Sequence, residues 1–439
     1  MSVTMSTDLL LNNRSLSTRY KSSTANGLAY PLAMKSSHGS TIIDIEGRKY
    51  LDLSAGYGVV NVGWQRAELI KTIQEQAEKS CFVSPWMSSE ESTELAEKLL
   101  SLSPKSISKV MRAAGGGEAV ENALKVFRSQ YPDGEILSFN HAYHGGTSAT
   151  LALGDHERFN FPQGMSHLNV HKINPPYSFR YYSGGLDEFS DTLEKKLKDN
   201  AKIKAIIFEP ILGSGGIITP PMEFYILIRE ICHRHNLIMI VDEVLTGFGR
   251  TGSLLASNEF DLMPDIICLA KGLSSGYMPI GATLLSPELA ITMESNFDDV
   301  TSTFSWTPLA AKVASKNIDL ILSEDLAEKS KESGEYFKRQ LSAIFYRYLP
   351  GNVGEIRGRG LFIGIELVND LKTKAPAEYL AKKIVLKCKS AGLIMTASWD
   401  HHILTIHPPL IITKDELDMA LHILESTLRQ ISRPKIFSH

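Results

Sequence analysis

Hydrophobic residues in the middle of the chain gather in short runs, and stretches with helical spacing of apolar residues separate these runs. The runs that we expect to form buried strands lie at residues 110–111, 136–139, 205–208, 237–241 and 266–270. Strands that alternate with helices predict an α/β fold whose mostly parallel sheet is covered on both faces. Ligands of such sheets bind beyond the carboxyl ends of the strands, so we expect a site there.

The two ends of the chain show a pattern typical of a smaller α+β domain. The expected elements are a β-hairpin at 40–53, helices at 67–78, 89–102 and 308–346, strands at 361–367 and 403–407, and a last helix from Lys414. We therefore expect an N-terminal arm at 1–28, a first part of the small domain at 29–75, a large domain at 76–310 and the rest of the small domain at 311–439. The first 25 residues are rich in Ser, Thr and Asn, which favours a mobile arm over a transit peptide.

The composition is that of a soluble globular protein, since 43% of the residues are hydrophobic and 22% are charged. A length of 439 residues favours two domains. The net charge of −3 gives no reason to expect a nucleic acid or a membrane surface as partner, and no apolar run approaches the ~18 residues that span a bilayer. The four cysteines are scattered without disulfide or metal spacing, so we expect no metal and a reducing, cytoplasmic setting.

Two of the expected strands end in side chains that suggest a chemistry. The run 266–270 leads to Lys271, and the run 237–241 leads to Asp242. Pyridoxal phosphate (PLP) needs such a pair, because a lysine forms the Schiff base with its aldehyde and a carboxylate keeps its pyridine nitrogen protonated. A strand-end lysine alone is more often a solvated loop residue, so the prediction depends on further motifs.

Two loops at the same edge of the sheet supply candidates for phosphate and ring contacts. Gly115, Gly116 and Gly117 follow a strand and open a helix, where free N–H groups and the helix dipole can hold an anion. Tyr143, in the loop after the next strand, could lie flat on a pyridine ring, with stacking worth about 0.5–1.5 kcal/mol. Taken singly, a plain turn and a half-buried structural tyrosine explain these residues better.

Together the motifs resemble the class III aminotransferases, the ornithine, 4-aminobutyrate and ω-amino-acid branch of the fold-type-I PLP enzymes. The most specific segments are 241–252, with the sequence Val-Asp-Glu-Val-Leu-Thr-Gly-Phe-Gly-Arg-Thr-Gly, and 265–273. The resemblance extends from about residue 30 to the last helix. It implies a large PLP-binding domain with a mostly parallel sheet and a smaller α+β domain.

The resemblance also implies roles for single residues. Lys271 would form the Schiff base, and Asp242 would pair with the pyridine nitrogen. The other cofactor contacts that it implies are the phosphate ligands Gly116 and Gly117, Tyr143 and Val244 on the two faces of the ring, and His144 and Glu209 beside it. Thr303 resembles a threonine that reaches the phosphate from the neighbouring subunit, which implies an obligate homodimer with its active site at the interface.

The reaction that the resemblance implies consists of two half-reactions. An amine donor leaves its amino group on the cofactor, and a keto or aldehyde acceptor then takes this group in the reverse sequence. Lys271 would act as the general base that moves the proton of the substrate carbon. Burial and the nearby ring cation should lower the pKa of Lys271, so that its amine is free when it must act as base.

The sequence departs from the family at two positions that would bind a substrate carboxylate. Members that use α-amino acids usually carry a glutamate and an arginine that pair there, and Ser214 and Thr405 stand in their places. Loss of both charges is physically coherent, because one left alone would be a buried unpaired charge. Either another cation such as Arg112 binds carboxylates, or the principal substrate lacks an α-carboxylate, as an amine, aldehyde, amino sugar or biosynthetic intermediate does. On the second reading, terminal amines outperform α-amino acids.

Further aromatic and histidine residues bear on the substrate. Tyr57, Trp86 and Trp306 stand in segments that often line the substrate pocket, and suggest an apolar or ring-bearing substrate, although ordinary core positions explain them as well. Residues 399–402 and His407 bring several histidines near the missing arginine. Loop histidines explain these better than a metal site, since no carboxylate or cysteine spacing completes one. They could still assist substrate recognition.

Two other functions stay open on the sequence alone. Some relatives with the same cofactor are racemases, epimerases or aminomutases, which release no keto product and need no second substrate. A catalytically silent binding protein with this fold is the other reading, and the intact pair of Lys271 and Asp242 argues against it.

Overall fold

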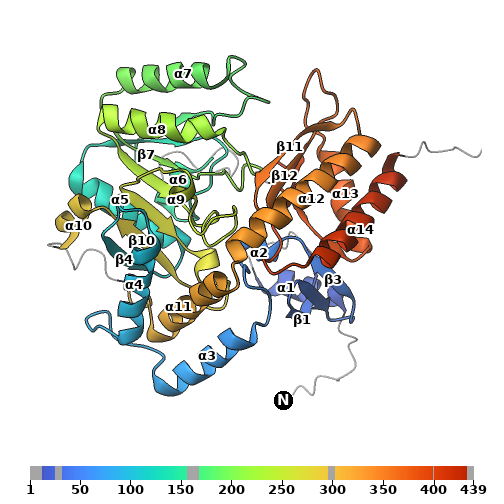
Figure 1. Ribbon diagram of the computed structural model, residues 1–439, viewed down its shortest axis with the longest axis horizontal. Coiled ribbons are helices and arrows are strands. Elements are labelled where there is room, and N and C mark those ends of the chain that lie inside the picture. The colour runs from blue at the N-terminus through green and yellow to red at the C-terminus, as the bar shows by residue number, and fades with distance from the viewer. Residues whose placement is uncertain (1–11, 25–31, 156–167, 295–301, 399, 433–439) are drawn as a thin grey trace, which may run out of the picture.

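The computed structural model of the chain describes residues 12–24, 32–155, 168–294, 302–398 and 400–432, and every structural statement below concerns these residues. They form a large lobe around a central sheet and a smaller lobe built from both ends of the chain (Figure 1).

The large lobe contains a sheet of seven strands. In spatial order they are β4 (Lys109–Ala113), β10 (Gly281–Leu285), β9 (Ile266–Leu269), β8 (Ile238–Asp242), β7 (Ile203–Phe208), β5 (Glu135–Phe139) and β6 (Val170–Ile173). Strands β9 to β6 run parallel, and β10 is antiparallel to both β4 and β9. The mostly parallel sheet is therefore confirmed, and β6 and β10 are strands that the sequence did not indicate.

Helices cover both faces of this sheet. Phe139 packs with Phe224 of helix α8 on one face, whereas Ile136 and Ile207 pack with Phe127 of helix α5 on the other. Because both faces are buried, the strands read as continuous apolar runs in the sequence. The helical elements of this part of the chain are α2 (Ala55–Gly58), α3 (Ala67–Lys79), α4 (Glu90–Leu102), α5 (Gly116–Gln130), α6 (Ser148–Leu153), α7 (Gly185–Asp199), α8 (Met222–His235), α9 (Ala256–Glu259), the 3₁₀ turn η1 (Lys271–Leu273) and α10 (Pro287–Glu294).

The small lobe contains two sheets of four strands each. One consists of β1 (Met34–His38), β2 (Thr41–Asp44), β3 (Lys49–Asp52) and β13 (Leu393–Ile394), and the other of β11 (Val353–Arg359), β12 (Phe362–Leu367), β15 (Ile403–Ile406) and β14 (Thr396–Ala397). Strand β3 pairs in parallel with β13, so the N-terminal hairpin and the C-terminal part share one sheet.

The remaining helices are α11 (Pro308–Ser323), α12 (Leu326–Tyr348), α13 (Glu378–Ser390) and α14 (Lys414–Ser432). Helix α11 packs on α3 and α4, and α12 packs on α14 and β11. The domain limits expected from the sequence remain a proposal. Among the described residues, none of the helices combines the length and the apolar character that a membrane span requires.

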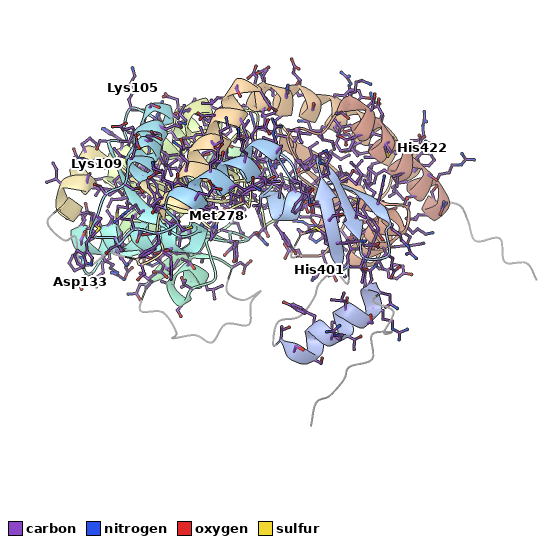
Figure 2. All side chains as sticks on the ribbon, turned by 90° about the horizontal axis from the view of Figure 1, so that it is seen from below. Lys105, Lys109, Asp133, Met278, His401 and His422 are labelled. Carbon is purple, nitrogen blue, oxygen red and sulfur yellow. The ribbon has the colours of Figure 1, made fainter. Side chains whose placement is uncertain are left out.

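Helix α1 (Asn13–Ser23) lies in the segment where the sequence indicated only an arm. Asn12 begins it with a reciprocal capping box to Ser15, which explains why a short polar helix forms here. Asn13 donates to Asp44 (2.8 Å) and to Glu46 (3.0 Å), and no residue of the helix is buried. Figure 2 shows this helix standing clear of the body of the fold. Residues 1–11 and 25–28 of the expected arm lie outside the described residues.

A buried ionic network connects the two lobes. Arg357 of β11 donates to Glu366 of β12 (2.8 Å) and to the carbonyl oxygen of Gly216 (2.7 Å) in the large lobe. Arg180 and the hydroxyl of Tyr177, also from the large lobe, donate to the same carboxylate. The network therefore holds the loop around Gly216 against the small lobe.

Candidate active site

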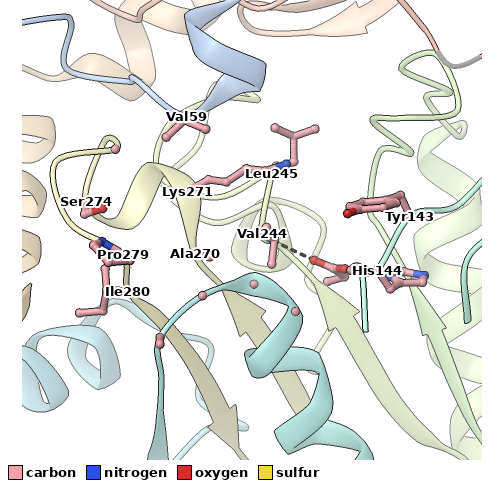
Figure 3. A pocket seen from close by; sticks show the side chains of 18 of the residues that line it. Val59, Tyr143, His144, Val244, Leu245, Ala270, Lys271, Ser274, Pro279 and Ile280 are labelled. Carbon is pink, nitrogen blue, oxygen red and sulfur yellow. Dashed lines mark hydrogen bonds and ion pairs between the residues drawn. The ribbon is translucent and has the colours of Figure 1, made fainter. Parts of the chain in front are cut away.

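Lys271 and Asp242 lie at the carboxyl ends of neighbouring strands. Strands β8 and β9 are parallel. Asp242 pairs with Cys268, which lies three residues before Lys271. Both side chains line one cavity of about 550 Å³ at this edge of the sheet. Figure 3 shows Lys271 reaching into this pocket from one side, while Tyr143 and His144 face it from the other. The expected proximity of positions 242 and 271 is thus present in the fold.

A glycine cradle, formed by Gly115, Gly116 and Gly117, borders the cavity at the start of α5. A Cβ atom added at Gly116 would lie 2.9 Å from Cγ1 of Val244, so no side chain fits there without movement. The first N–H groups of the helix point toward the space beyond its end, which is the arrangement that binds phosphate.

Asp242 is held in place from two sides. Nδ1–H of His144 donates to one carboxylate oxygen (2.7 Å), and the backbone N–H of Val244 donates to the other (3.0 Å). Only 3% of Asp242 is exposed. The other ring nitrogen of His144, Nε2, is buried and has no hydrogen-bond partner among the described residues.

Glu209 follows β7 and closes the same side of the cavity. Its carboxylate accepts hydrogen bonds from the backbone N–H groups of Tyr143 (3.1 Å) and Gly213 (2.9 Å). Burial, together with the negative charge of Asp242, raises the pKa of Glu209. A proton on this side chain is therefore less costly than on an exposed glutamate.

The electrostatic surroundings of Lys271 lower the pKa of its amine. Burial lowers the pKa of Lys271, the carboxylates of Glu209 and Asp242 raise it, and the guanidinium of Arg250 lowers it again, with a net decrease. The side chain of Lys271 is partly exposed and borders the cavity. The lowered pKa expected from burial is present in the fold.

The residues around the cavity fit PLP. An amine faces a buried carboxylate that two donors orient, and a helix start with three glycines lies on the same cavity wall. These are the groups that the aldehyde, the pyridine nitrogen and the phosphate of PLP require. When PLP binds here, Lys271, Asp242, Gly116 and Gly117 are the residues placed to hold it.

The two positions that depart from the family pattern have different surroundings. Ser214 lines the cavity, whereas Thr405 does not. Thr405 lies within β15, and its hydroxyl forms a hydrogen bond with that of Thr396 on β14 (2.8 Å). The strand pairing turns the side chain of Thr405 toward β14, and its role as a substrate contact stays a prediction.

Arg112, the alternative carboxylate ligand, also lies away from the described wall of the cavity. Its guanidinium donates to the backbone oxygen of Pro85 (3.0 Å). Among the described residues that line the cavity, Lys271 is the one lysine or arginine.

The three aromatic residues have separate roles in the fold. Trp306 is a core residue, only 2% exposed, and its indole N–H donates to the carbonyl oxygen of Gly281 (2.6 Å). Strand β10 thus supplies an acceptor that holds the ring in the core, and the pocket role of Trp306 stays a prediction. Tyr57 and Trp86 are exposed and lie outside the described lining, as does Thr303.

The histidines do not form one cluster. His401 and His402 line a second cavity of about 380 Å³ together with Asp400 and His141. His407 is buried elsewhere, donates to the carbonyl oxygen of Ser54 (2.6 Å), and has its pKa lowered to about 3 by burial. Residue 399 lies outside the described residues.

Several wall residues of the cavity carry no motif that could have identified them. They are Val59, Ser274, Met278, Pro279 and Ile280. Most are apolar and sit in turns, so only the three-dimensional arrangement reveals them. They make one side of the cavity apolar.

Comparisons with known proteins agree with this geometry. The chain matches the family described as aminotransferase class-III over residues 23–428. Ornithine aminotransferase 2 of Staphylococcus saprophyticus is 34% identical over 404 residues, which cover 90% of this chain and 94% of the relative. An (S)-enantioselective omega-transaminase from Thermomicrobium roseum superposes with a TM-score of 0.89 at 30% identity, covering 96% of this chain and 99% of that one. An amine transaminase from an uncultivated Pseudomonas species, solved with PLP bound, gives a TM-score of 0.87 at 29% identity, over 93% of this chain and 98% of that one.

Proposed function

Because the chain belongs to the class-III aminotransferases, which work with PLP, we propose that its amino donor is an amine or ω-amino compound without a carboxylate on the reacting carbon. A keto or aldehyde compound accepts the amino group in the second half-reaction. In this proposal Lys271 forms the Schiff base and Asp242 is the partner of the pyridine nitrogen.

The charge of the cavity wall carries the proposal about the donor. The charged wall residues among those described are Lys271, Glu209 and Asp242, and Lys271 is committed to the cofactor. Asp242 is likewise committed to the cofactor, so a carboxylate on the reacting carbon would face Glu209 without a cation to offset it. An unpaired charge in such a site costs about 1–3 kcal/mol or more, so carboxylate-free donors are favoured.

The chemistry follows from what the residues can do. Bound PLP supplies an aldehyde that joins an amine and a ring that takes up electrons. Lys271, with its lowered pKa, would accept the proton of the substrate carbon and pass it on to the cofactor. His144 and the N–H of Val244 keep Asp242 oriented, and the apolar residues Leu245 and Ile280 reduce the access of water.

We also propose that the chain works as a homodimer with the active site at the interface. Phe82 and Phe304 are both exposed, and their ring centroids lie 6.1 Å apart. Trp86 and Met87 are more than half exposed in the same part of the sequence as Phe82. Large apolar side chains gathered on a surface are typical of an interface, and Thr303 precedes Phe304 there. Sedimentation velocity should give a dimer at micromolar concentration, and a monomer would contradict this part.

Matched donor pairs test the proposed substrate class. Each pair differs only in the α-carboxylate: 4-aminobutyrate and glutamate, and phenylethylamine and phenylalanine. The bleaching of the visible absorbance of the bound cofactor reports the first half-reaction without any acceptor. We expect the donor without the α-carboxylate to react at least about tenfold faster in each pair, which corresponds to 1.4 kcal/mol. Glutamate as the fastest donor would overturn the proposal.

The alternative of a racemase, epimerase or aminomutase is not favoured. The three proteins compared above carry the names of transaminases. A chirality assay without keto acid separates the two functions, because a transaminase stops after one turnover there. The cytoplasm stays our proposed location, based on the scattered cysteines of the sequence.

A further inference from the structure

Arg250 is a buried arginine that contacts three separate segments of the chain. Its side chain is 0% exposed. Nη2 donates to Oδ1 of Asn61 (2.7 Å), and Nη1 donates to the carbonyl oxygens of Leu361 (3.1 Å) and Pro408. Residue 61 belongs to the N-terminal part of the chain, and residues 361 and 408 flank strands of the small lobe. One guanidinium therefore joins the segment after Asp242 to both ends of the chain.

The contact with Asn61 leads directly to the turn that carries Lys271. A Cβ atom added at Gly272 would lie 2.6 Å from Nδ2 of Asn61 and 3.1 Å from Cβ of Phe248. The same Nδ2 donates to the carbonyl oxygen of Phe248 (2.8 Å). Asn61 thus fills the space between Arg250 and Gly272, the residue that follows Lys271. A shift of Arg250 would be passed to this turn.

The positive charge of Arg250 has no carboxylate next to it. Its hydrogen-bond acceptors are two carbonyl oxygens and one amide oxygen, and Nε is buried without a partner among the described residues. Asp52 acts on Arg250 only from a distance, and its own carboxylate accepts from Ser54, Ala55 and Trp64. Burial of a cation in this manner is costly and calls for a reason beyond stability.

We propose that Arg250 is a positioning residue for Lys271. Through Asn61, Arg250 fixes the turn around Gly272, and its uncompensated positive charge disfavours a proton on the nitrogen of Lys271. The groups that act on this nitrogen are Glu209 and Asp242 at the strand ends and Arg250 behind the turn, while His407 on the opposite side is neutral. Arg250 offsets part of the effect of the two carboxylates. The inference rests on the proposed role of Lys271 as the Schiff-base residue.

The test measures the protonation of that nitrogen in the holoenzyme. The visible absorbance of bound PLP changes when the Schiff-base nitrogen gains a proton, so a pH titration of the absorbance gives a midpoint. Arg250→Met removes the charge, and we expect the midpoint to rise by about one pH unit. Arg250→Lys retains a charge but not the fork of donors, and the midpoint should move much less although the thermal stability falls.

Ser330→Ala is the matched control for a purely structural role. The hydroxyl of Ser330 donates to the carbonyl oxygen of Arg250 (3.0 Å) and accepts from the N–H of Leu361 (3.0 Å), so its loss weakens the same connection without a change in charge. We expect lower thermal stability and an unchanged midpoint for Ser330→Ala. An Arg250→Met midpoint equal to that of the wild type would overturn the inference.

A second variant covers the case in which Arg250→Met does not fold. Asn61→Asp would place a carboxylate against Nη2 and neutralise the guanidinium, although it also removes the donor to the carbonyl oxygen of Phe248. The midpoint should rise here too, and an unmoved midpoint would overturn the inference. A wild-type chain that shows no visible absorbance with PLP would instead refute the role of Lys271, so the two failures are distinguishable.

Discussion

The glycine cradle allows a sharp test of where the phosphate of PLP binds. Gly116→Ala keeps the backbone N–H and adds one methyl group. That methyl carbon would lie 2.9 Å and 3.1 Å from the two Cγ atoms of Val244, whereas favourable contacts between carbon atoms are about 3.5–4.0 Å. Either Val244 or the start of α5 must therefore move by roughly half an ångström or more.

The size of the effect follows from known costs of overpacking. Extra methyl groups in a packed site cost about 1–3 kcal/mol. We expect this cost to fall on the PLP-bound state, because the cofactor ring would hold Val244 in place, while Val244 is free to move before PLP binds. A central value of ~2 kcal/mol corresponds to an affinity for PLP about 30-fold lower.

Gly115→Ala is the matched control in the same cradle. The backbone at Gly115 is extended, and an added Cβ atom would meet nothing within 4 Å. We expect less than about threefold loss of affinity, as for a small change at a helix N-cap. The assay is a fluorescence or absorbance titration of each apoprotein with PLP, with thermal melting of the apoproteins alongside.

A double variant locates the conflict. Val244→Ala removes both Cγ atoms that Gly116→Ala would meet, so the two changes together should lose less affinity than the sum of the single losses. Equal PLP affinity for Gly116→Ala and the wild type would refute the reasoning. Equal losses for Gly115→Ala and Gly116→Ala would also contradict it, since only one of them has a neighbour in reach.

Three further predictions concern the ionic network, a buried histidine and the substrate. Glu366→Gln should lower the free energy of unfolding by about 3–5 kcal/mol, because it removes the carboxylate between the buried guanidinium of Arg357 and the partly buried one of Arg180. The control is Glu355→Gln, which removes a half-exposed contact to Arg357 and should cost less than about 1 kcal/mol in urea denaturation; equal losses would contradict the network. The pKa of His407 in the native state is about 3, so the unfolded chain takes up a proton between pH 6.5 and 3 and the native chain does not. The contribution of the neutral His407 to the free energy of unfolding is therefore complete above pH 6.5 and falls by an amount on the order of 4 kcal/mol toward pH 3. His407→Asn should flatten that part of a stability profile measured by urea at several pH values, whereas an unaltered slope would show another group at work. Ser214→Arg places a cation on the cavity wall. It should raise the ratio of kcat/KM for glutamate to kcat/KM for 4-aminobutyrate by about tenfold or more, which is the value of a charge-assisted hydrogen bond. An unchanged ratio would mean that the missing cation does not set the preference.

The elements that could be predicted are those with a local signal. Buried parallel strands read as apolar runs, and parallel pairing then brings the ends of β8 and β9 together, so Lys271 and Asp242 could be placed at one site before any coordinates. Strand β10 was not indicated by the sequence, and it pairs antiparallel with both β4 and β9. The direction of a strand leaves no mark in a sequence. The sheet could therefore be predicted in type but not in order.

The sequence predictions that the described contacts do not support concern residues whose surroundings depend on a distant partner. Trp306 looks like a pocket residue until the carbonyl oxygen of Gly281 is found beside its indole. Thr405 faces β14 because of a pairing with Thr396 that no spacing indicates. The partners of Arg250 are likewise remote in sequence, so its burial could not be inferred from its motif. Local patterns identify the reacting groups, and tertiary contacts decide what surrounds them.

The parallel pairing of β3 with β13 has a consequence for synthesis of the protein. Leu51 leaves the ribosome early, and its partner Leu393 is made near the end of translation. At ~5–20 residues per second, the first hairpin waits on the order of tens of seconds with one edge open. An open strand edge is a template for pairing with other chains. Nascent chains that stall before residue 393 should therefore aggregate or occupy chaperones, even though the strands and helices around Lys271 are already complete.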